Sequence, residues 1–396
     1  MRRFACALVV GAVLVAAGLN CEKERPIGLY DPAQKYNPDP IITSLEPADS
    51  ALAGLVTVTV NGQNFSPIAQ NNFVYFGKTR VPTLEASPVR LVVKSPNVVA
   101  DAIPVKVAVL GALSFSNVVN YKLVRGVFTI GGYGEFDEPY VVECDRDENV
   151  FVVLGSRNVE KITPAGEKQV YGTVPFSLPS GIKMGPGGYL YVGRRSTSFY
   201  RIPPGGGAAV KWITAPGRID DFDFAPDGTM YAGGKGDFLY NIKPDGSAAA
   251  VADYPNTYIR AVRVFEDYVY IGGRDDATGR HYVWRNRINP DGTLAPKEVY
   301  FDWGSRIDTT SEVQAITFAQ DGDLYIGTNA PQALVVVHRD GSFEPLYPGV
   351  LEPASNYLAW GNSNFLYICR RSEDPKKKAV LKVNMLKQGA PYYGRT

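Results

Sequence analysis

The sequence predicts an all-β protein with two folded parts, a small β-sandwich followed by a six-bladed β-propeller. Tyr, Gly and Pro are abundant, at 24, 40 and 29 of 396 residues, and these types favour strands and turns. Short runs of alternating apolar and polar residues lie between turn signals, and one strand–turn–strand pattern recurs six times. The 41 basic and 40 acidic residues nearly cancel, which argues against a nucleic-acid binder.

The first 40 residues predict export and anchoring. Residues 1–20 carry two arginines directly after Met1 and continue with an uncharged apolar run that is too short to span a bilayer, as in a secretory signal peptide. Cys21 follows directly, and this order resembles the bacterial lipoprotein signal, which implies a lipid on Cys21. An ordinary cleaved signal is the alternative. Residues 21–40 are rich in proline and are predicted to form a tether between the membrane and the folded part.

Residues 41–122 have the strand spacing of a small sandwich, with turn residues about every ten positions. This segment resembles the IPT/TIG family of immunoglobulin-like domains. The residues that carry the resemblance are Leu45-Glu46-Pro47, Val60-Asn61-Gly62-Gln63-Asn64-Phe65, Phe76-Gly77, Ser95-Pro96 and Asn120-Tyr121. The resemblance implies a spacer or interaction module without catalytic groups.

Residues 125–396 contain the repeats. Counted from Glu143, the corresponding residues lie 40, 40, 40, 54 and 42 positions apart along the chain, at Lys183, Asp223, Arg263, Thr317 and Ala359. A period near 40 with four strands per repeat predicts a six-bladed β-propeller. Residues 131–140 resemble the signature that opens a blade in NHL-repeat proteins. We expect the strand 127–130 to complete the sixth blade and close the ring.

The innermost strand of each blade alternates between core and channel positions. Glu143, Lys183, Asp223 and Arg263 alternate in sign at one position, so they are predicted to form a ring on the channel wall. A structural network of ion pairs is the favoured interpretation, because buried charge is costly unless paired. A polar site for a small ligand is the alternative. Cys144 and Cys369 occupy different levels of the sheets, and we expect two free, mostly buried thiols.

Polar and aromatic residues are predicted to surround the channel mouth, where ligands bind in many proteins. The candidate binding rim consists of Arg218, Tyr258, Tyr282, Trp284 and Glu312. Six-bladed propellers of the gluconolactonase type hold one divalent cation at the mouth, and Glu138 resembles the first ligand of that site. Asp220 and Asn356 are the candidate partners, and oxygen ligands suit calcium or magnesium. No other cofactor is expected.

The predicted function is that of a cell-surface or outer-membrane lipoprotein that binds a protein or glycan through its propeller without catalysis. The two histidines, at positions 281 and 338, lie outside the inner strands, which disfavours histidine-based catalysis. A gluconolactonase-like metal-dependent hydrolase is one alternative. A structural subunit of an envelope or surface assembly is another. Membrane contact is expected only through the lipid anchor, and the oligomeric state and the ligand are left open.

Overall fold

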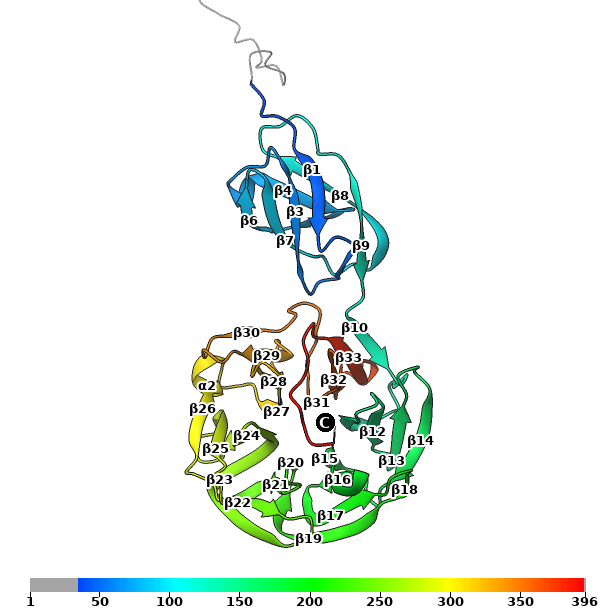
Figure 1. Cartoon of the computed structure of the whole chain (residues 1–396), viewed down its shortest axis with the longest axis vertical. Coiled ribbons are helices and arrows are strands. Elements are labelled where there is room, and N and C mark those ends of the chain that lie inside the picture. The colour runs from blue at the N-terminus through cyan, green and yellow to red at the C-terminus, as the bar shows by residue number, and fades with distance from the viewer. Residues whose placement is uncertain (1–34, 395–396) are drawn as a thin grey trace, which may run out of the picture. The chain divides into compact units, whose positions relative to one another are not determined.

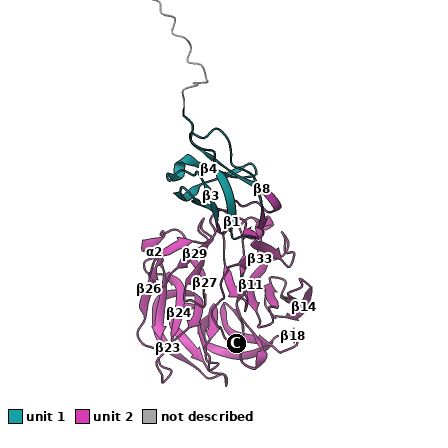
Figure 2. Ribbon diagram, turned by 45° about the horizontal axis from the view of Figure 1, so that its top comes forward, with its two compact units in different colours: residues 1–48, 59–93, 104–120 teal, residues 49–58, 94–103, 121–396 magenta. Residues whose placement is uncertain are grey.

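The computed structural model describes residues 35–394, so the expected signal peptide, Cys21 and most of the tether lie outside the described residues. The chain divides into two compact units (Figure 2). The first unit comprises the residues up to 48 together with 59–93 and 104–120. The second unit comprises residues 49–58, 94–103 and everything from 121 onward. Within the described range, no helix combines the length and the apolar character that a membrane span requires.

The N-terminal strands form the two sheets of a sandwich. One sheet has the order β1-β3-β7-β6, with bounds Ile41–Glu46, Thr57–Gln63, Arg90–Lys94 and Thr83–Ser87. The other has the order β2-β9-β8-β4-β5, with bounds Ser50–Leu52, Val119–Val124, Ala100–Val109, Asn72–Phe76 and Thr79–Val81. Residues at alternate positions of these strands are buried, among them Val60, Val74, Leu91 and Val107. A single 3₁₀ turn, Ala69–Asn71, precedes β4.

The remaining strands form six blades around a central channel (Figure 1). Blade 1 contains β11 (Pro139–Cys144), β12 (Val150–Leu154), β13 (Asn158–Ile162) and β14 (Lys168–Thr173), with β18 (Gly207–Ala208) beside β14. Blade 2 contains β15 (Pro179–Met184), β16 (Leu190–Arg194), β17 (Ser196–Ile202) and β19 (Val210–Ile219). Blade 5 contains β27 (Val313–Phe318), β28 (Leu324–Thr328), β29 (Leu334–Val337) and β30 (Phe343–Pro345).

Blades 3 and 4 share one long strand. The 18-residue strand β23 (Ala248–Phe265) is first the outer strand of blade 3 and then the inner strand of blade 4. The other strands of these two blades are β20 (Asp221–Phe224), β21 (Met230–Gly233), β22 (Lys235–Ile242), β24 (Tyr268–Asp275), β25 (His281–Arg287) and β26 (Glu298–Asp302). The short helix α2 (Trp303–Arg306) follows β26, and 3₁₀ turns lie at Pro186–Gly188 and Pro375–Lys377.

The sixth blade closes the ring as predicted. It contains β31 (Tyr357–Trp360), β32 (Phe365–Arg370), β33 (Ala379–Asn384) and, from the start of the propeller, β10 (Val127–Ile130). β10 pairs antiparallel with β33, from Val127 opposite Val383 to Ile130 opposite Val380. The predicted pairing of residues 127–130 with the last blade is therefore confirmed.

The repeated Asp-Gly turns explain why the strands reverse where they do. The carboxylates of Asp227, Asp245, Asp291 and Asp340 each accept a hydrogen bond from the backbone N–H two residues later. The glycine that follows each of them has φ between +81° and +87°, the left-handed region that a side chain disfavours. The turn residues therefore determine the strand ends in several blades.

The core of the propeller lies between the blades. The residues at alternate positions of the inner strands are buried, including Val142, Ile182, Phe222, Val262, Ile316 and Leu358. Cys144 and Cys369 are both buried and neither forms a disulfide, as predicted. The Cys369 thiol lies 3.2 Å from the carbonyl oxygen of Pro139, and burial raises its pKa to about 12.

Candidate functional site

A β-bulge recurs at the start of the inner strands and forms the channel mouth, the end at which those strands begin. In four blades the pairing of the inner strand shifts by one residue, at Tyr140, Ser180, Arg260 and Gln314. An extra residue in one strand interrupts the alternation and turns a side chain away from its usual direction. The bulge residues therefore line the mouth and do not pack between blades.

Six polar residues, one from each blade, form a ring at this mouth. Asp220 and Asn356 occupy the positions of the bulge residues in blades 3 and 6, so the mouth ring is Tyr140, Ser180, Asp220, Arg260, Gln314 and Asn356. The ring surrounds a cavity of about 60 Å³. The cavity is also lined by Arg195, Tyr258, Tyr357 and Arg371. Six repeats thus bring hydroxyl, amide, carboxylate and guanidinium groups together on one axis.

Asp220 is the acidic member of the mouth ring and is 4% exposed. Arg218 holds it in a bidentate pair, with Nε 2.6 Å and Nη2 2.8 Å from the two carboxylate oxygens. The Tyr258 hydroxyl donates a hydrogen bond to Asp220 at 2.7 Å, and Arg195 lies 3.7 Å away. Charge-assisted bidentate pairs are among the strongest polar contacts in proteins, so this carboxylate is fixed in orientation.

Arg260 and Arg371 place further positive charge at the mouth. Arg260 contacts Glu312 at 3.1 Å and donates to the Gln314 side chain at 3.1 Å through the same nitrogen. The guanidinium of Arg371 lies 4.0 Å from the centre of the Tyr140 ring, a cation–π contact. Among residues 35–394, the Arg260 Nε and the Ser180 hydroxyl are buried without a hydrogen-bond partner.

A second polar layer lies deeper in the channel and contains the four residues predicted as the channel ring. Glu143, Lys183, Asp223 and Arg263 are all buried, with 2–4% exposure. Lys183 pairs with Glu143 at 3.4 Å, as expected from the alternation of sign. Arg263 pairs at 3.3 Å with Asp221, a residue outside the predicted ring.

Asp223 differs from its neighbours in the deep layer. Its carboxylate accepts a hydrogen bond from the backbone N–H of Val264 at 2.9 Å. Burial raises the pKa of the Asp223 carboxyl, which favours the protonated form. Burial also lowers the pKa of the Lys183 ammonium in the same layer, which favours its neutral form.

Tyr357 connects the two halves of the deep layer. Its hydroxyl accepts from Lys183 Nζ at 2.8 Å and donates to Asp221 at 3.0 Å. Three other blades have Gly181, Ala261 and Ala315 at the corresponding position, which leaves room for a large ring from blade 6. Sequence reasoning missed Tyr357, although the small residues at its equivalent positions were a readable signal.

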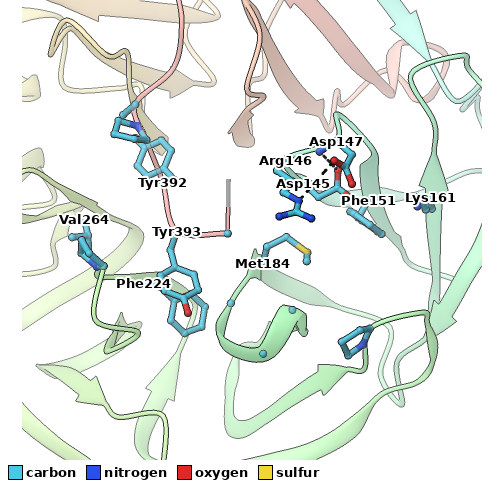
Figure 3. A pocket seen from close by; sticks show the side chains of 18 of the residues that line it. Asp145, Arg146, Asp147, Phe151, Lys161, Met184, Phe224, Val264, Tyr392 and Tyr393 are labelled. Atoms are coloured by element: carbon cyan, nitrogen blue, oxygen red, sulfur yellow. Dashed lines mark hydrogen bonds and ion pairs between the residues drawn. The ribbon is translucent and has the colours of Figure 1, made fainter. Parts of the chain in front are cut away.

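A much larger cavity, about 1070 Å³, opens at the other end of the channel, where the inner strands turn into the second strands (Figure 3). The C-terminal segment 390–394 lines it, and the Tyr392 hydroxyl accepts from the backbone N–H of Phe318 at 2.6 Å. Its acidic groups have partners on the protein: Asp145 accepts hydrogen bonds from Asp147 and Asn149 within one turn, Asp147 pairs with Arg146, and Glu266 pairs with Arg339. We therefore regard the mouth as the stronger candidate site.

The predicted rim residues separate into two groups. Arg218, Tyr258 and Glu312 lie around the mouth ring through the contacts given above. Trp284 is 5% exposed and packs against Tyr254 on the outer strand of blade 3, which corrects its expected place on the rim. Tyr282 packs beside Trp284 on β25, the third strand of the blade, and does not line the mouth cavity.

The candidate metal ligands do not form a cluster. Asp220 and Asn356 line the mouth cavity, but Asp220 is held by arginine and the Asn356 side-chain oxygen accepts from the Arg371 backbone N–H at 2.8 Å. Glu138 is exposed and pairs with Lys378 at 3.4 Å. Across residues 35–394, no group of three or more His, Cys, Asp or Glu side chains is placed to hold a metal ion.

Comparison with known proteins supports the fold. Residues 40–122 match the family model of the IPT/TIG domain. The chain is similar to auxiliary nutrient binding proteins from Bacteroides ovatus ATCC 8483 (15% identity, TM-score 0.53, 87% of this chain and 97% of that chain covered) and Bacteroides thetaiotaomicron VPI-5482 (14%, 0.53, 88% and 98%). It is also similar to a luciferin-regenerating enzyme (14%, 0.50, 67% and 97%).

At these identities the structural likeness establishes the fold alone. No curated protein sequence matches the chain. The family match covers the predicted sandwich, and the six blades account for the repeats that follow it. The chain therefore contains an IPT/TIG domain at residues 40–122, followed by a six-bladed β-propeller.

Proposed function

We propose that this protein is an exported binding protein whose ligand site is the mouth of the propeller. The observation that carries the proposal is the mouth ring, in which every blade contributes one polar side chain to the same cavity. Buried polar atoms without partners, such as the Ser180 hydroxyl, carry a free-energy cost that a bound ligand or water removes. In this proposal residues 41–122 act as a spacer and residues 125–396 as the binding platform.

The chemistry of the mouth favours binding over catalysis. Tyrosine, serine, amide and arginine side chains hold ligands by hydrogen bonds and charge, and the one ring carboxylate is fixed by Arg218. His281 lies on the third strand of blade 4, where it accepts from the Val313 backbone N–H and burial lowers its pKa to about 4. His338 pairs with Asp323 at 3.1 Å, near the turn after β29.

The same arrangement weakens the metal-dependent hydrolase alternative. A cation at the mouth would compete with Arg218 for Asp220, and that pair would have to separate first. The alternative of a structural envelope subunit makes no use of the mouth ring. We therefore propose neither of them as the function.

The binding proposal is tested with glycan arrays and with surface proteins from the host cell, probed with the purified mature protein. A matched pair of variants separates the two ends of the channel. Tyr140→Ala removes an aromatic ring from the mouth, and Tyr393→Ala removes one from the opposite cavity. We expect a specific ligand that the first variant loses and the second retains. Binding that is insensitive to Tyr140→Ala contradicts the proposal.

We further propose that a lipid on Cys21 anchors the protein at the cell surface. In cells, Cys21→Ser is expected to move the protein from the membrane fraction to the soluble exported fraction. Cys6→Ser, in the segment predicted to be removed, is the matched control and should leave the distribution unchanged. If the Cys21→Ser protein still partitions into detergent, the anchor lies elsewhere.

A further inference from the structure

The charges at the mouth do not balance. Arg195, Arg218 and Arg260 approach two carboxylates, those of Asp220 and Glu312. Arg371 adds a fourth guanidinium beside the cavity. Four arginines against two carboxylates leave an excess of two positive charges around one small opening. Glu138, 3.5 Å from the Tyr140 hydroxyl, is offset by Lys378 and does not change that excess. Such an excess attracts anions and disfavours neutral ligands of the same shape.

We propose that the mouth of the propeller binds the carboxylate group of an acidic ligand. This inference rests on the proposed binding function and adds the chemical class of the ligand. The shared chemistry is a carboxylate, as carried by a uronic acid residue of an acidic saccharide or by a free organic acid. Guanidinium groups present paired N–H donors that match the two oxygens of a carboxylate.

Donors are available for such a group at the mouth. Arg371 is exposed, and within the described part of the chain no carboxylate oxygen lies within 4 Å of its guanidinium. Arg195 is 56% exposed and reaches Asp220 only at 3.7 Å. The Arg260 Nε adds a buried N–H without a partner. Three guanidinium groups from blades 2, 4 and 6 therefore retain donor capacity around one cavity.

The size of the cavity limits what enters it. A volume of about 60 Å³ corresponds to roughly four or five water-sized positions. A carboxylate and the atom that carries it fit into that space, whereas a whole sugar ring does not. The Ser180 hydroxyl and the Gln314 and Asn356 side chains line the same cavity and offer polar contacts to atoms next to the carboxylate. The rest of the ligand would lie outside, against Tyr140 and Tyr258.

The test is calorimetric titration of the mature protein with three probes, D-glucuronate, D-glucose and acetate. We expect glucuronate to bind at least about tenfold more tightly than glucose, the loss expected for one charge-assisted hydrogen bond. Added salt should weaken the binding, because exposed charges are screened. If acetate binds as tightly as glucuronate, the ligand that carries the carboxylate is a simple organic acid. If acetate binds more weakly, that ligand is an acidic saccharide.

Matched variants locate the site. Arg371→Gln and Arg195→Gln, both at exposed positions, should each weaken glucuronate binding about tenfold without lowering the melting temperature. Arg146→Gln is the control, because Arg146 is 75% exposed and lines the opposite cavity. If Arg146→Gln weakens binding and the mouth variants do not, the inference is wrong.

Other results overturn the inference while leaving the binding function intact. If glucose binds as tightly as glucuronate, and Tyr140→Ala abolishes that binding, the mouth recognises neutral ligands. A second such result is that an array ligand binds but neither glucuronate nor acetate does. If neither binds at about ten times the concentration at which the array ligand binds, the acidic ligand class is rejected. Failure of the array experiment and of all three titrations together would reject the proposed function itself.

Discussion

The two aspartates on β20 are predicted to respond differently to the same substitution. Asp221 is paired with Arg263 at 3.3 Å, accepts from the Val262 backbone N–H at 2.9 Å and contacts the Tyr357 hydroxyl. Asp223 accepts one backbone hydrogen bond, and burial raises the pKa of its carboxyl. Asp221→Asn removes a charge that a buried arginine needs, whereas Asp223→Asn resembles the protonated form that the fold favours.

The expected magnitudes follow from burial. Removing one partner of a buried ion pair costs about 3–5 kcal/mol, because the other charge is left uncompensated. The asparagine retains some hydrogen bonds, so we expect Asp221→Asn to lower the free energy of unfolding by about 3 kcal/mol. That corresponds to a fall of about 6–12 °C in the melting temperature. Asp223→Asn should remain within about 1 kcal/mol of the natural protein.

The pH dependence adds a second readout. Because the folded protein raises the pKa of Asp223, it binds this proton more tightly than the unfolded chain does. The stability associated with that carboxyl is therefore complete below its ordinary pKa, about 4, and is lost as the pH rises through the folded value. Asp223→Asn should flatten this decline in thermal melts recorded from pH 4 upward. Equal destabilisation by the two substitutions would refute the assigned pairing.

Three further predictions concern closure, the C-terminal segment and the thiols. A protein that lacks residues 1–131 should melt at a lower temperature than one that lacks residues 1–122, because only the longer deletion removes β10. Equal melting temperatures would contradict closure by β10. Tyr392→Phe should cost about 1–3 kcal/mol in denaturant unfolding, since it leaves a buried N–H without its acceptor; no change in the midpoint would contradict that role. Cys144 and Cys369 should resist a thiol reagent at pH 8 until the protein unfolds, and fast labelling in the native state would contradict their burial.

Much of the fold was predictable because it repeats. A period near 40 residues and recurrent turns identified the six blades. Residues 127–130 form a strand before the first blade, and this predicted that they pair with the last blade and close the ring. The sandwich was predictable from its alternation and from its family resemblance, which the match at residues 40–122 confirms. The merging of blades 3 and 4 through β23 was not predictable, since nothing in the repeat distinguishes a continuous strand from two strands with a bend.

The binding rim was harder to predict because of the bulges. Sequence reasoning selected residues five positions before the channel ring, such as Arg218 and Tyr258, from their place near the strand starts, although an odd offset in an unbroken strand points away from the channel. The bulge instead turns the residue three positions before the ring into the mouth, as at Tyr140 and Arg260. Trp284 was misplaced for a different reason, because an aromatic residue on a third strand is equally compatible with core and surface.

The contrast between the two polar layers links structure to function in this propeller. The deep layer satisfies itself: Lys183 and Arg263 each have an acidic partner, and Tyr357 joins the pairs across the channel. Such a layer stabilises the ring of blades and offers a ligand few free groups. The mouth, three residues earlier on the same strands, keeps an excess of arginine and buried atoms without partners. Tyr357 lines the mouth cavity, whereas none of the four residues of the predicted channel ring does. A ligand in that cavity therefore meets the unbalanced layer, which is why we assign structure to one layer and binding to the other.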